Sequence, residues 1–536
     1  MTHFKRTKAG LIMAGAVAGV LALSTVVASG SRLPTAPQPK ATNPGIALRA
    51  PKIPGVPALR GPVAASATPS PKMGLLYVTP AQGVAGTPLR ISGTKLPAST
   101  NVELTWSTAS ATWMADPQPD TVNYTGSVDT YFNVVLKHVE TNAKGAFSVK
   151  TTMPDDFGGT HDIYAVVAGS ELDHGGVTLL RKLTVSPRRG PIGTPITVTY
   201  TGMGASEYTA GAALLWDNHY AGEMQANWTR GTARVTIRAA GPVGTHFIQV
   251  GDAISFLYMN IPQSPLTYAT GATIPFTVTR DDGPPAASMD WPASVAPTIS
   301  ARTTLDLSKL AAGTKVAETL STRRGPVHSK VTVSATGFST TTPVHVLWST
   351  VVGSRVNCKG ICWAFVSQTI GTATPSASGK LSTTVHVPGV SLGGWHVIQL
   401  VQGKNVMAEV PYYIEASIVG KGVSSLVVRE GASFTIHLMG IGWTQLDNTV
   451  AVDYDNSYIG YGCGFNSNGN TILNLHATGT PGTHIIDIYP MLYTASPSFA
   501  HTPWGMVPVL SYARDDPGLA LGYRLPAMRF AITVVG

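Results

Sequence analysis

The chain has 536 residues, of which only 12% are charged, and its formal net charge is +9. Residues 1–72 hold nine basic and no acidic residues, so the remainder is neutral, with 28 residues of each sign. A folded nucleic-acid-binding domain normally needs clustered basic charge, so the neutral balance argues against a nucleic-acid partner. The 56 glycines and 39 prolines favour short strands joined by turns.

Residues 1–30 have the layout of a secretory signal peptide. A basic lead precedes an apolar run from Ala9 to Val27, and small residues follow before Ser31. An uncleaved membrane anchor is the alternative, because a run of this length can just span a bilayer. The small residues Ala28 and Gly30 favour cleavage, so we expect a secreted or cell-surface protein without a membrane span after cleavage.

Residues 31–72 hold ten prolines, six basic residues and no acid. Proline at this density disfavours both helices and sheet ladders, so we expect an extended, solvated tether. Contact of its basic residues with an anionic envelope polymer is an alternative.

A short motif, Gly-Thr/Trp-His followed by an apolar strand, occurs four times and sets the spacing of the rest of the chain. Its histidines are His161, His246, His396 and His484, which are 85, 150 and 88 residues apart. Residues 193–250 also align without a gap on residues 431–488. The chain is therefore a repeat protein in which a two-domain unit is duplicated.

We name the four repeats a, b, a′ and b′. The expected boundaries are 73–186 for a, 187–283 for b, 284–320 for a linker with a short helix or strand, 321–419 for a′ and 420–536 for b′. Each repeat opens with a Gly/Pro turn and a strand of alternating apolar residues. A second alternating strand ends in a large aromatic residue, expected on the buried face: Trp106, Trp216, Trp348 and Tyr454.

These motifs resemble the immunoglobulin-like repeats of secreted bacterial proteins, of the IPT/TIG type. The resemblance rests on the Gly-Pro-Ile-Gly-Thr opening, on the strands at 197–204 and 332–338, and on the later Gly-x-His strand. It covers most of 73–280 and 321–536 and implies an all-β fold of four tandem immunoglobulin-like β-sandwiches. It also implies adhesion, spacing or accessory binding at a surface, and it brings no catalytic residue. The cysteine pair of antibody domains is absent.

Repeats a and a′ carry insertions after the aromatic strand, at 109–131 and 351–365. Loops that a rigid sandwich supports often carry binding groups, so we take the insertion aromatics as candidate ligand-binding residues. They are Trp113, Tyr124, Tyr131, Trp363 and Phe365. One interpretation is a stacking surface for sugar rings or an adhesive contact; the other is that they fold back and cover the sandwich edge.

The chain has three cysteines. In a secreted protein, Cys358 and Cys362 are expected to form a small disulfide at the tip of the second insertion. Cys463 is expected to be a buried thiol, with pairing across a domain contact or between two chains as alternatives.

The repeated polar residues favour structural roles. Asp217-Asn218 and Asp455-Asn456 follow alternating strands, which predicts hairpin turns rather than ligand sites. The four repeated histidines are expected to hydrogen-bond loop carbonyls rather than a metal. The acidic pairs 155–156, 281–282 and 515–516 are expected to be solvated turn residues, with structural calcium as an unsupported alternative.

The sequence holds none of the common catalytic elbow, zinc-helix or phosphate-loop motifs, so we expect no catalytic residues, metal or cofactor. The first hypothesis is a non-enzymatic secreted or cell-surface rod for adhesion, envelope structure or assembly into a larger structure. Its partners would be an extracellular protein, a polysaccharide or further copies of the chain. The second is a carbohydrate-binding array that uses the insertion aromatics, and the third is an extracellular hydrolase with a site at a domain junction.

Overall fold

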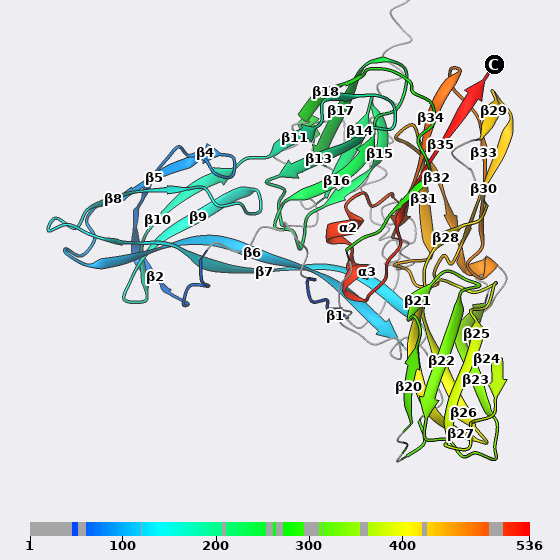
Figure 1. The fold of residues 1–536 in the computed structure, drawn as a ribbon. Coiled ribbons are helices and arrows are strands. Elements are labelled where there is room, and N and C mark those ends of the chain that lie inside the picture. Colours follow the sequence, from blue (N-terminus) through cyan, green and yellow to red (C-terminus); the bar gives the residue numbers. More distant parts are fainter. Residues whose placement is uncertain are drawn as a thin grey trace, which may run out of the picture. The chain divides into compact units, whose positions relative to one another are not determined.

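The computed structural model describes residues 45–51, 61–118, 121–205, 211–252, 261–263, 272–293, 310–312, 314, 316–353, 363–420, 426–492 and 507–536. The expected signal peptide lies outside these residues, as do Cys358 and Cys362. In the described part of the chain, no helix is long and apolar enough to cross a membrane. The fold is all-β with several small sheets, and its helical turns are short (Figure 1). These turns are η1 (Ile261–Gln263), η4 (Phe465–Ser467), α2 (Tyr512–Asp515) and α3 (Pro517–Ala520).

Each repeat forms a sandwich of a three-stranded sheet and a larger sheet. In domain a, the smaller sheet is β3 (Tyr77–Thr79), β5 (Pro88–Gly93) and β8 (Phe147–Thr152). The larger sheet runs in the order β1 (Ile46–Ala47), β6 (Asn101–Gln118), β9 (Gly159–Val167), β10 (Ser170–Leu179) and β2 (Thr68–Leu75), with β7 (Thr121–Glu140) on β6 and β4 (Gln82–Gly83) on β10.

Domain b has β11 (Lys182–Ser186), β13 (Pro195–Thr201) and β16 (Ala233–Arg238) in one sheet. Its second sheet is β12 (Arg189–Gly190), β18 (Ala272–Val278), β17 (Gly244–Asp252), β14 (Gly211–Trp216) and β15 (His219–Gln225).

Domain a′ repeats this order with β20 (Ala317–Leu320), β22 (Lys330–Thr336) and β25 (Lys380–His386). Its larger sheet is β21 (Arg324–Gly325), β27 (Asn405–Ile414), β26 (Gly394–Gln402), β23 (Val344–Gly353) and β24 (Trp363–Ala373).

Domain b′ has β28 (Ser417–Ile418), β30 (Ser433–Met439) and β33 (Thr471–His476) in its smaller sheet. The larger sheet is β19 (Ser288–Asp290), β35 (Ala527–Val535), β34 (Gly482–Met491), β31 (Thr449–Tyr454) and β32 (Ser457–Cys463), with β29 (Val427–Arg429) on β35. Strand β19 comes from the expected linker and pairs with the last strand of the chain.

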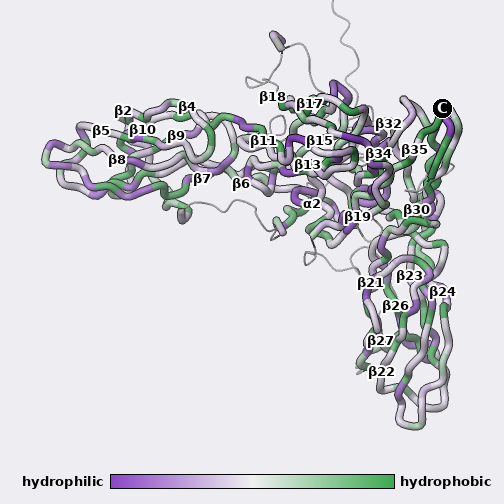
Figure 2. The backbone as a smooth tube through the Cα atoms, turned by 45° about the horizontal axis from the view of Figure 1, so that its top comes forward, coloured by the Kyte–Doolittle hydropathy of each residue, from purple (hydrophilic) through white to green (hydrophobic). Residues whose placement is uncertain are grey.

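The apolar residues of the two sheets meet in a shared core in each domain, as the strand alternation predicts. Hydrophobic and hydrophilic residues are accordingly interspersed along the strands rather than gathered in one long segment (Figure 2). The four repeated aromatic residues are buried, which confirms the prediction for Trp106, Trp216, Trp348 and Tyr454.

The repeated histidines serve the scaffold, as predicted. In every copy, Nε2 lies within hydrogen-bond distance of the carbonyl oxygen four residues earlier, at 2.6 Å for His161, 2.7 Å for His246, 2.8 Å for His396 and 2.8 Å for His484. Each ring also lies against the repeated aromatic side chain, with centroids 4.3 to 5.4 Å apart. The histidine therefore joins the entry loop of its strand to the core.

The Asp-Asn pairs are hairpin turns, which confirms that prediction. Asp217, Asn218, Asp455 and Asn456 all have φ between 50° and 67°, in the left-handed region that a tight hairpin turn needs. In domain b, the Asp217 carboxylate also contacts His246 Nδ1 at 2.5 Å, and Asp455 makes the same contact with His484 at 2.6 Å. The pair thus fixes the turn and orients the histidine.

The segment expected to be a solvated tether differs where the structure describes it. Strand β1 pairs with β6, and Leu48 is buried beside it. Strand β2 pairs in parallel with β10 and contains Pro69 and Pro71, which an edge strand tolerates because its outer side needs no donors. Parts of residues 45–75 therefore belong to the larger sheet of domain a.

Candidate functional site

The first insertion is a two-stranded ribbon, because β6 and β7 continue beyond the sandwich as 18 and 20 residue strands. Trp113, on this ribbon, is only 5% exposed. Its Nε1 donates to Asp515 Oδ1 at 3.0 Å, and Tyr124 packs edge-on against its ring at 5.7 Å. The backbone nitrogen of Tyr124 donates to Gln445 Oε1 at 3.2 Å. The ribbon folds back onto other domains, which leaves no open indole face at Trp113 for a sugar ring.

Asp515 is the common acceptor at this junction. Besides Trp113 of domain a, its carboxylate accepts the backbone N–H groups of Asn227 and Trp228 of domain b. The side chain is fully buried. Burial raises the pKa of Asp515 to about 6, although its hydrogen bonds favour the charged form. Three domains are thus held by one carboxylate, because Asp515 itself lies in the C-terminal domain b′.

Two of the three acidic pairs were wrongly predicted to be solvated. Asp515 and Asp516 are buried, and so is Asp156, which accepts from Trp106 Nε1 at 2.9 Å and pairs with Arg230 at 2.7 Å. Arg230 belongs to domain b, so Asp156 also joins two domains. Asp281 is the exposed exception, and its carboxylate accepts the backbone N–H of Thr483 at 2.8 Å.

Domains b and b′ share a buried ion network. Arg238 of b contacts the Asp487 carboxylate at 2.5 Å, and Arg529 contacts the same group at 3.0 Å. Arg529 also donates to the backbone oxygen of Thr236 at 3.1 Å and to Tyr489 Oη at 2.8 Å. These charges are not part of the repeat, because the 238-residue offset places His476 opposite Arg238 and Gln249 opposite Asp487. They serve the contact between the two copies.

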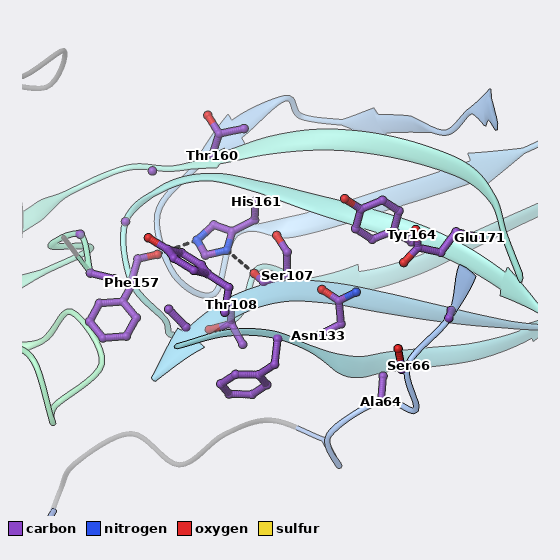
Figure 3. Close-up of a pocket in the computed structure, with 18 of the residues that line it drawn as sticks. Ala64, Ser66, Ser107, Thr108, Asn133, Phe157, Thr160, His161, Tyr164 and Glu171 are labelled. Carbon is purple, nitrogen blue, oxygen red and sulfur yellow. Dashed lines mark hydrogen bonds between the residues drawn. The ribbon is translucent and has the colours of Figure 1, made fainter. Parts of the chain in front are cut away.

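A cleft of about 790 Å³ lies on the outer face of the larger sheet of domain a (Figure 3). Residues 63–67, here called the strap, run between β7 and the β9–β10 hairpin: Ala64 N donates to Asn133 O, and Thr68 N donates to Gly169 O, both at 2.9 Å. Beneath the strap, the strand alternation that buries Trp106 and Ile163 exposes Ser107 and Tyr164 on the opposite face. The cleft is therefore formed by the strap, by the outer face of this sheet and by Gly204 and Ala205 of domain b.

The lining of this outer-face cleft mixes aromatic rings, small residues and a few polar groups. It comprises residues 64–67, Ser107, Thr108, Ala109, Tyr131, Phe132, Asn133, residues 157–161, Tyr164, Glu171, Gly204 and Ala205. The described lining residues include no Lys or Arg, and Glu171 is the one carboxylate. Both ring nitrogens of His161 face carbonyl oxygens, of Ser107 and Phe157, so this ring has no free nitrogen to offer (Figure 3).

Glu171 is 8% exposed and lines this cleft. Burial raises the pKa of Glu171, and it likewise raises the pKa of the neighbouring Tyr164 hydroxyl, together with the charges of Asp162 and Glu171. Within the described part of the chain, no side chain donates a hydrogen bond to Glu171, and the Asn133 side-chain amide also has no partner. Both groups are thus available to a ligand.

The predicted site residues are distributed over different environments. Tyr131 is 73% exposed and lines the outer-face cleft, whereas Trp113 and Tyr124 lie at the domain junction. Phe365 of the second insertion is half-buried against a small cluster that includes Val351 and Trp443. The side chain of Trp363 lies outside the description, as do both cysteines of the expected disulfide. The predicted residues do not form one surface.

Cys463 was wrongly predicted to be buried. It is an exposed free thiol on β32. Its strand is the edge of the larger b′ sheet, and Ile459, Tyr461 and Cys463 alternate on the outward side. The apolar pattern of an edge strand therefore does not imply burial on both faces.

Sequence reasoning missed Tyr164, Glu171 and Asn133. The period-two pattern around Ile163 would have placed Tyr164 on the outer face, which is a usable signal. The position of Glu171 depends on the pairing of β10 with β9, and the strap lies in a stretch whose proline content indicated a tether. Neither could be read from the repeat.

Comparison with known proteins gives distant structural likenesses only. No protein-family model matches the chain, and no curated protein matches its sequence. A tetra-tandem repeat from the extending region of a large adhesion protein is 11% identical, with 85% of this chain and 98% of that chain covered and a TM-score of 0.18. Escherichia coli alpha-2-macroglobulin activated by porcine elastase is 10% identical, with 86% of this chain and 53% of that chain covered and a TM-score of 0.17.

A protein from Corynebacterium diphtheriae, described as membrane anchored, is 12% identical, with 63% of this chain and 90% of that chain covered and a TM-score of 0.16. With TM-scores below 0.5, these neighbours do not establish a shared domain arrangement, and we transfer no function from them.

Proposed function

We propose that this chain is a non-enzymatic extracellular structural and adhesion protein, in which four immunoglobulin-like sandwiches form a scaffold that presents binding surfaces. The observation that carries the proposal is the junction at Asp515, where one buried carboxylate accepts hydrogen bonds from domains a and b. Side chains that a hydrolase would need for chemistry are used here to hold domains together. The leader-like residues 1–30 support export.

The repeated histidines and aspartates favour this function over a hydrolase. His246 and His484 each have one ring nitrogen on an aspartate and the other on a loop carbonyl. A general base needs a nitrogen that faces the substrate. Since the same arrangement occurs at the same place in both copies, it serves the turn and the strand entry.

The test combines localisation with attachment. In cells that make the full chain, an antibody should label the intact surface or the secreted fraction, and brief external protease should remove the label. Loss of the protein should reduce attachment of the cells to surfaces or to each other, and electron microscopy of the secreted protein will show whether copies join into fibres. Retention in the cytoplasm, or a hydrolytic activity that the Asp217→Asn/Asp455→Asn double variant abolishes, would overturn the proposal.

A further inference from the structure

We propose that the outer-face cleft of domain a binds a neutral saccharide. Tyr131 stacks on a sugar ring, Glu171 accepts hydrogen bonds from the sugar hydroxyls, and the Asn133 amide donates a hydrogen bond to one of them. The inference rests on the proposed extracellular function, because a surface protein meets glycans, but its geometry is independent of where the protein is found.

The size and shape of the cleft suit a short oligosaccharide. Its volume of about 790 Å³ lies within the range of about 300–1,000 Å³ that ligand sites occupy. In the close-up, Phe157 and Tyr164 lie on opposite sides, Asn133 lies between them, and Ser66 lies below Tyr164 (Figure 3). The strap covers one side of the cleft, and Tyr131 is solvent-exposed at its lining. A chain of sugar units would therefore contact aromatic rings and polar groups in turn.

The polar groups select the chemistry of the ligand. The Glu171 carboxylate lines the cleft, and no hydrogen-bond partner among the described residues occupies its oxygens, so these oxygens can accept hydrogen bonds from a ligand. Phosphate, sulfate and carboxylate ligands are excluded, since the described lining offers no Lys or Arg and does offer the Glu171 carboxylate. A purely cationic ligand would suit the Glu171 carboxylate, but it would offer no acceptor to the N–H₂ group of Asn133.

A sugar matches both groups, because each hydroxyl donates one hydrogen bond and accepts others. Two neighbouring hydroxyls can donate to the two oxygens of Glu171, while another accepts from the Asn133 amide. The apolar C–H face of a sugar ring then packs on an aromatic ring, and Tyr131 presents most of its ring to solvent. No bond is broken in this binding, which agrees with a non-enzymatic protein.

The comparison with the duplicated domain supports a dedicated site. His161 corresponds to His396, and counting from these residues places Gln399 at the position of Tyr164. Glu171 pairs with Val166, and the corresponding pair in a′ is Val406 with Val401. The sandwich therefore does not need an acid at this position, because a valine occupies it in the twin.

The experiment uses the purified full chain on an array of neutral oligosaccharides of several configurations, with sialylated, sulfated and amino-sugar glycans beside them. We expect at least one neutral oligosaccharide to bind, and titration of that sugar to show at least a tenfold weakening for Tyr131→Ala and for Glu171→Gln. Binding should not fall when salt is raised, because no ion pair forms. Tyr461→Ala is the matched control, an exposed tyrosine on β32 of domain b′, and should bind within twofold of the unmodified chain.

Three results would overturn the inference: no neutral oligosaccharide binds, only amino sugars bind and salt removes them, or binding persists in both cleft variants. Glu171→Gln should fold with an unchanged or higher melting temperature, which separates a lost contact from a lost fold. If the protein binds the sugar but proves to be cytoplasmic, the saccharide site stands and only the proposed extracellular function is refuted.

Discussion

Domains a and a′ have the same interior and different exteriors. Trp106 and Trp348 are both fully buried and stack on His161 and His396 at 4.3 and 4.7 Å. Both domains also extend the sheet edge in the same way: Val406 of a′ pairs in parallel with Leu310, and Glu171 of a pairs in parallel with Pro69. The outer face of a is bridged by the strap, which leaves a cleft. The packing of the core is therefore alike in the two domains, while the residues and segments on the outer face differ.

The hairpin that begins with the aromatic strand also differs between domains a and a′. Strands β23 and β24 of a′ have 10 and 11 residues, whereas β6 and β7 of a continue to the junction at Asp515. The ribbon gives domain a contacts that the described residues of its twin do not make. Changes at these contacts should therefore affect the two domains unequally.

The largest effect is expected for Asp515→Ala, which removes the acceptor of Trp113, Asn227 and Trp228. Three buried donors would lose their partner, at a cost of about 4 kcal/mol. Because a four-domain protein need not unfold in one step, the measurement is the first denaturant transition together with protease cleavage of the ribbon. Asp282→Ala, at an exposed position, is the control and should change the midpoint little.

The second prediction uses the buried histidine of a′. Burial lowers the pKa of His396 from 6.5 to about 4, so the folded chain resists protonation. As the pH falls from 6.5 toward 4, the unfolded chain gains a proton that the folded chain does not, and stability falls by about 3 kcal/mol. The difference in unfolding free energy between the unmodified protein and His396→Gln, measured at several pH values, should decrease over this range. A difference independent of pH would contradict it.

His484 of b′ provides the reverse case within the same experiment. Burial alone lowers its pKa, but the hydrogen bond and charge of Asp455 outweigh burial and raise it. Its stabilisation is present in full below pH 6.5 and is lost as the pH rises through the raised pKa. His484→Gln should therefore cost more at acidic pH than at alkaline pH.

The third prediction compares the two core tryptophans. Trp106 Nε1 donates to the buried Asp156, whereas Trp348 Nε1 has no hydrogen-bond partner among the described residues. Replacement by Phe removes similar ring volume at both sites but leaves Asp156 short of a donor in domain a. Trp106→Phe should therefore cost about 1–2 kcal/mol more than Trp348→Phe in matched denaturant titrations. Equal costs would mean that the hydrogen bond contributes nothing net.

The smallest effect is a gain. Glu171→Gln replaces a buried carboxylate whose pKa is raised by burial, so the folded state at neutral pH should gain about 0.5–1 kcal/mol. The gain should shrink as the pH falls through the raised pKa of the folded state toward the unfolded value of 4.5, because the native side chain then becomes neutral too. Thermal melts at pH 7 and pH 4 measure it.

The repeat could be predicted because it depends on local residues. The glycine turns, the strand alternation, the buried aromatics and the histidine contacts all follow from short stretches such as residues 241–250. The candidate site depends on partners far apart in sequence: the strap meets β7, and β10 brings Glu171 beside Tyr164. Trp113 likewise has its partner Asp515 at a separation of 402 residues, which no periodicity reveals.

That separation in sequence imposes a delay during synthesis of the chain. At about 5–20 residues per second, on the order of half a minute passes between synthesis of Trp113 and of the aspartate that receives its hydrogen bond. Throughout this interval, the surfaces of the ribbon that are buried in the folded protein are exposed to water or covered by a chaperone. The first domain to emerge is accordingly the last to be finished, and its maturation depends on the whole chain having been delivered.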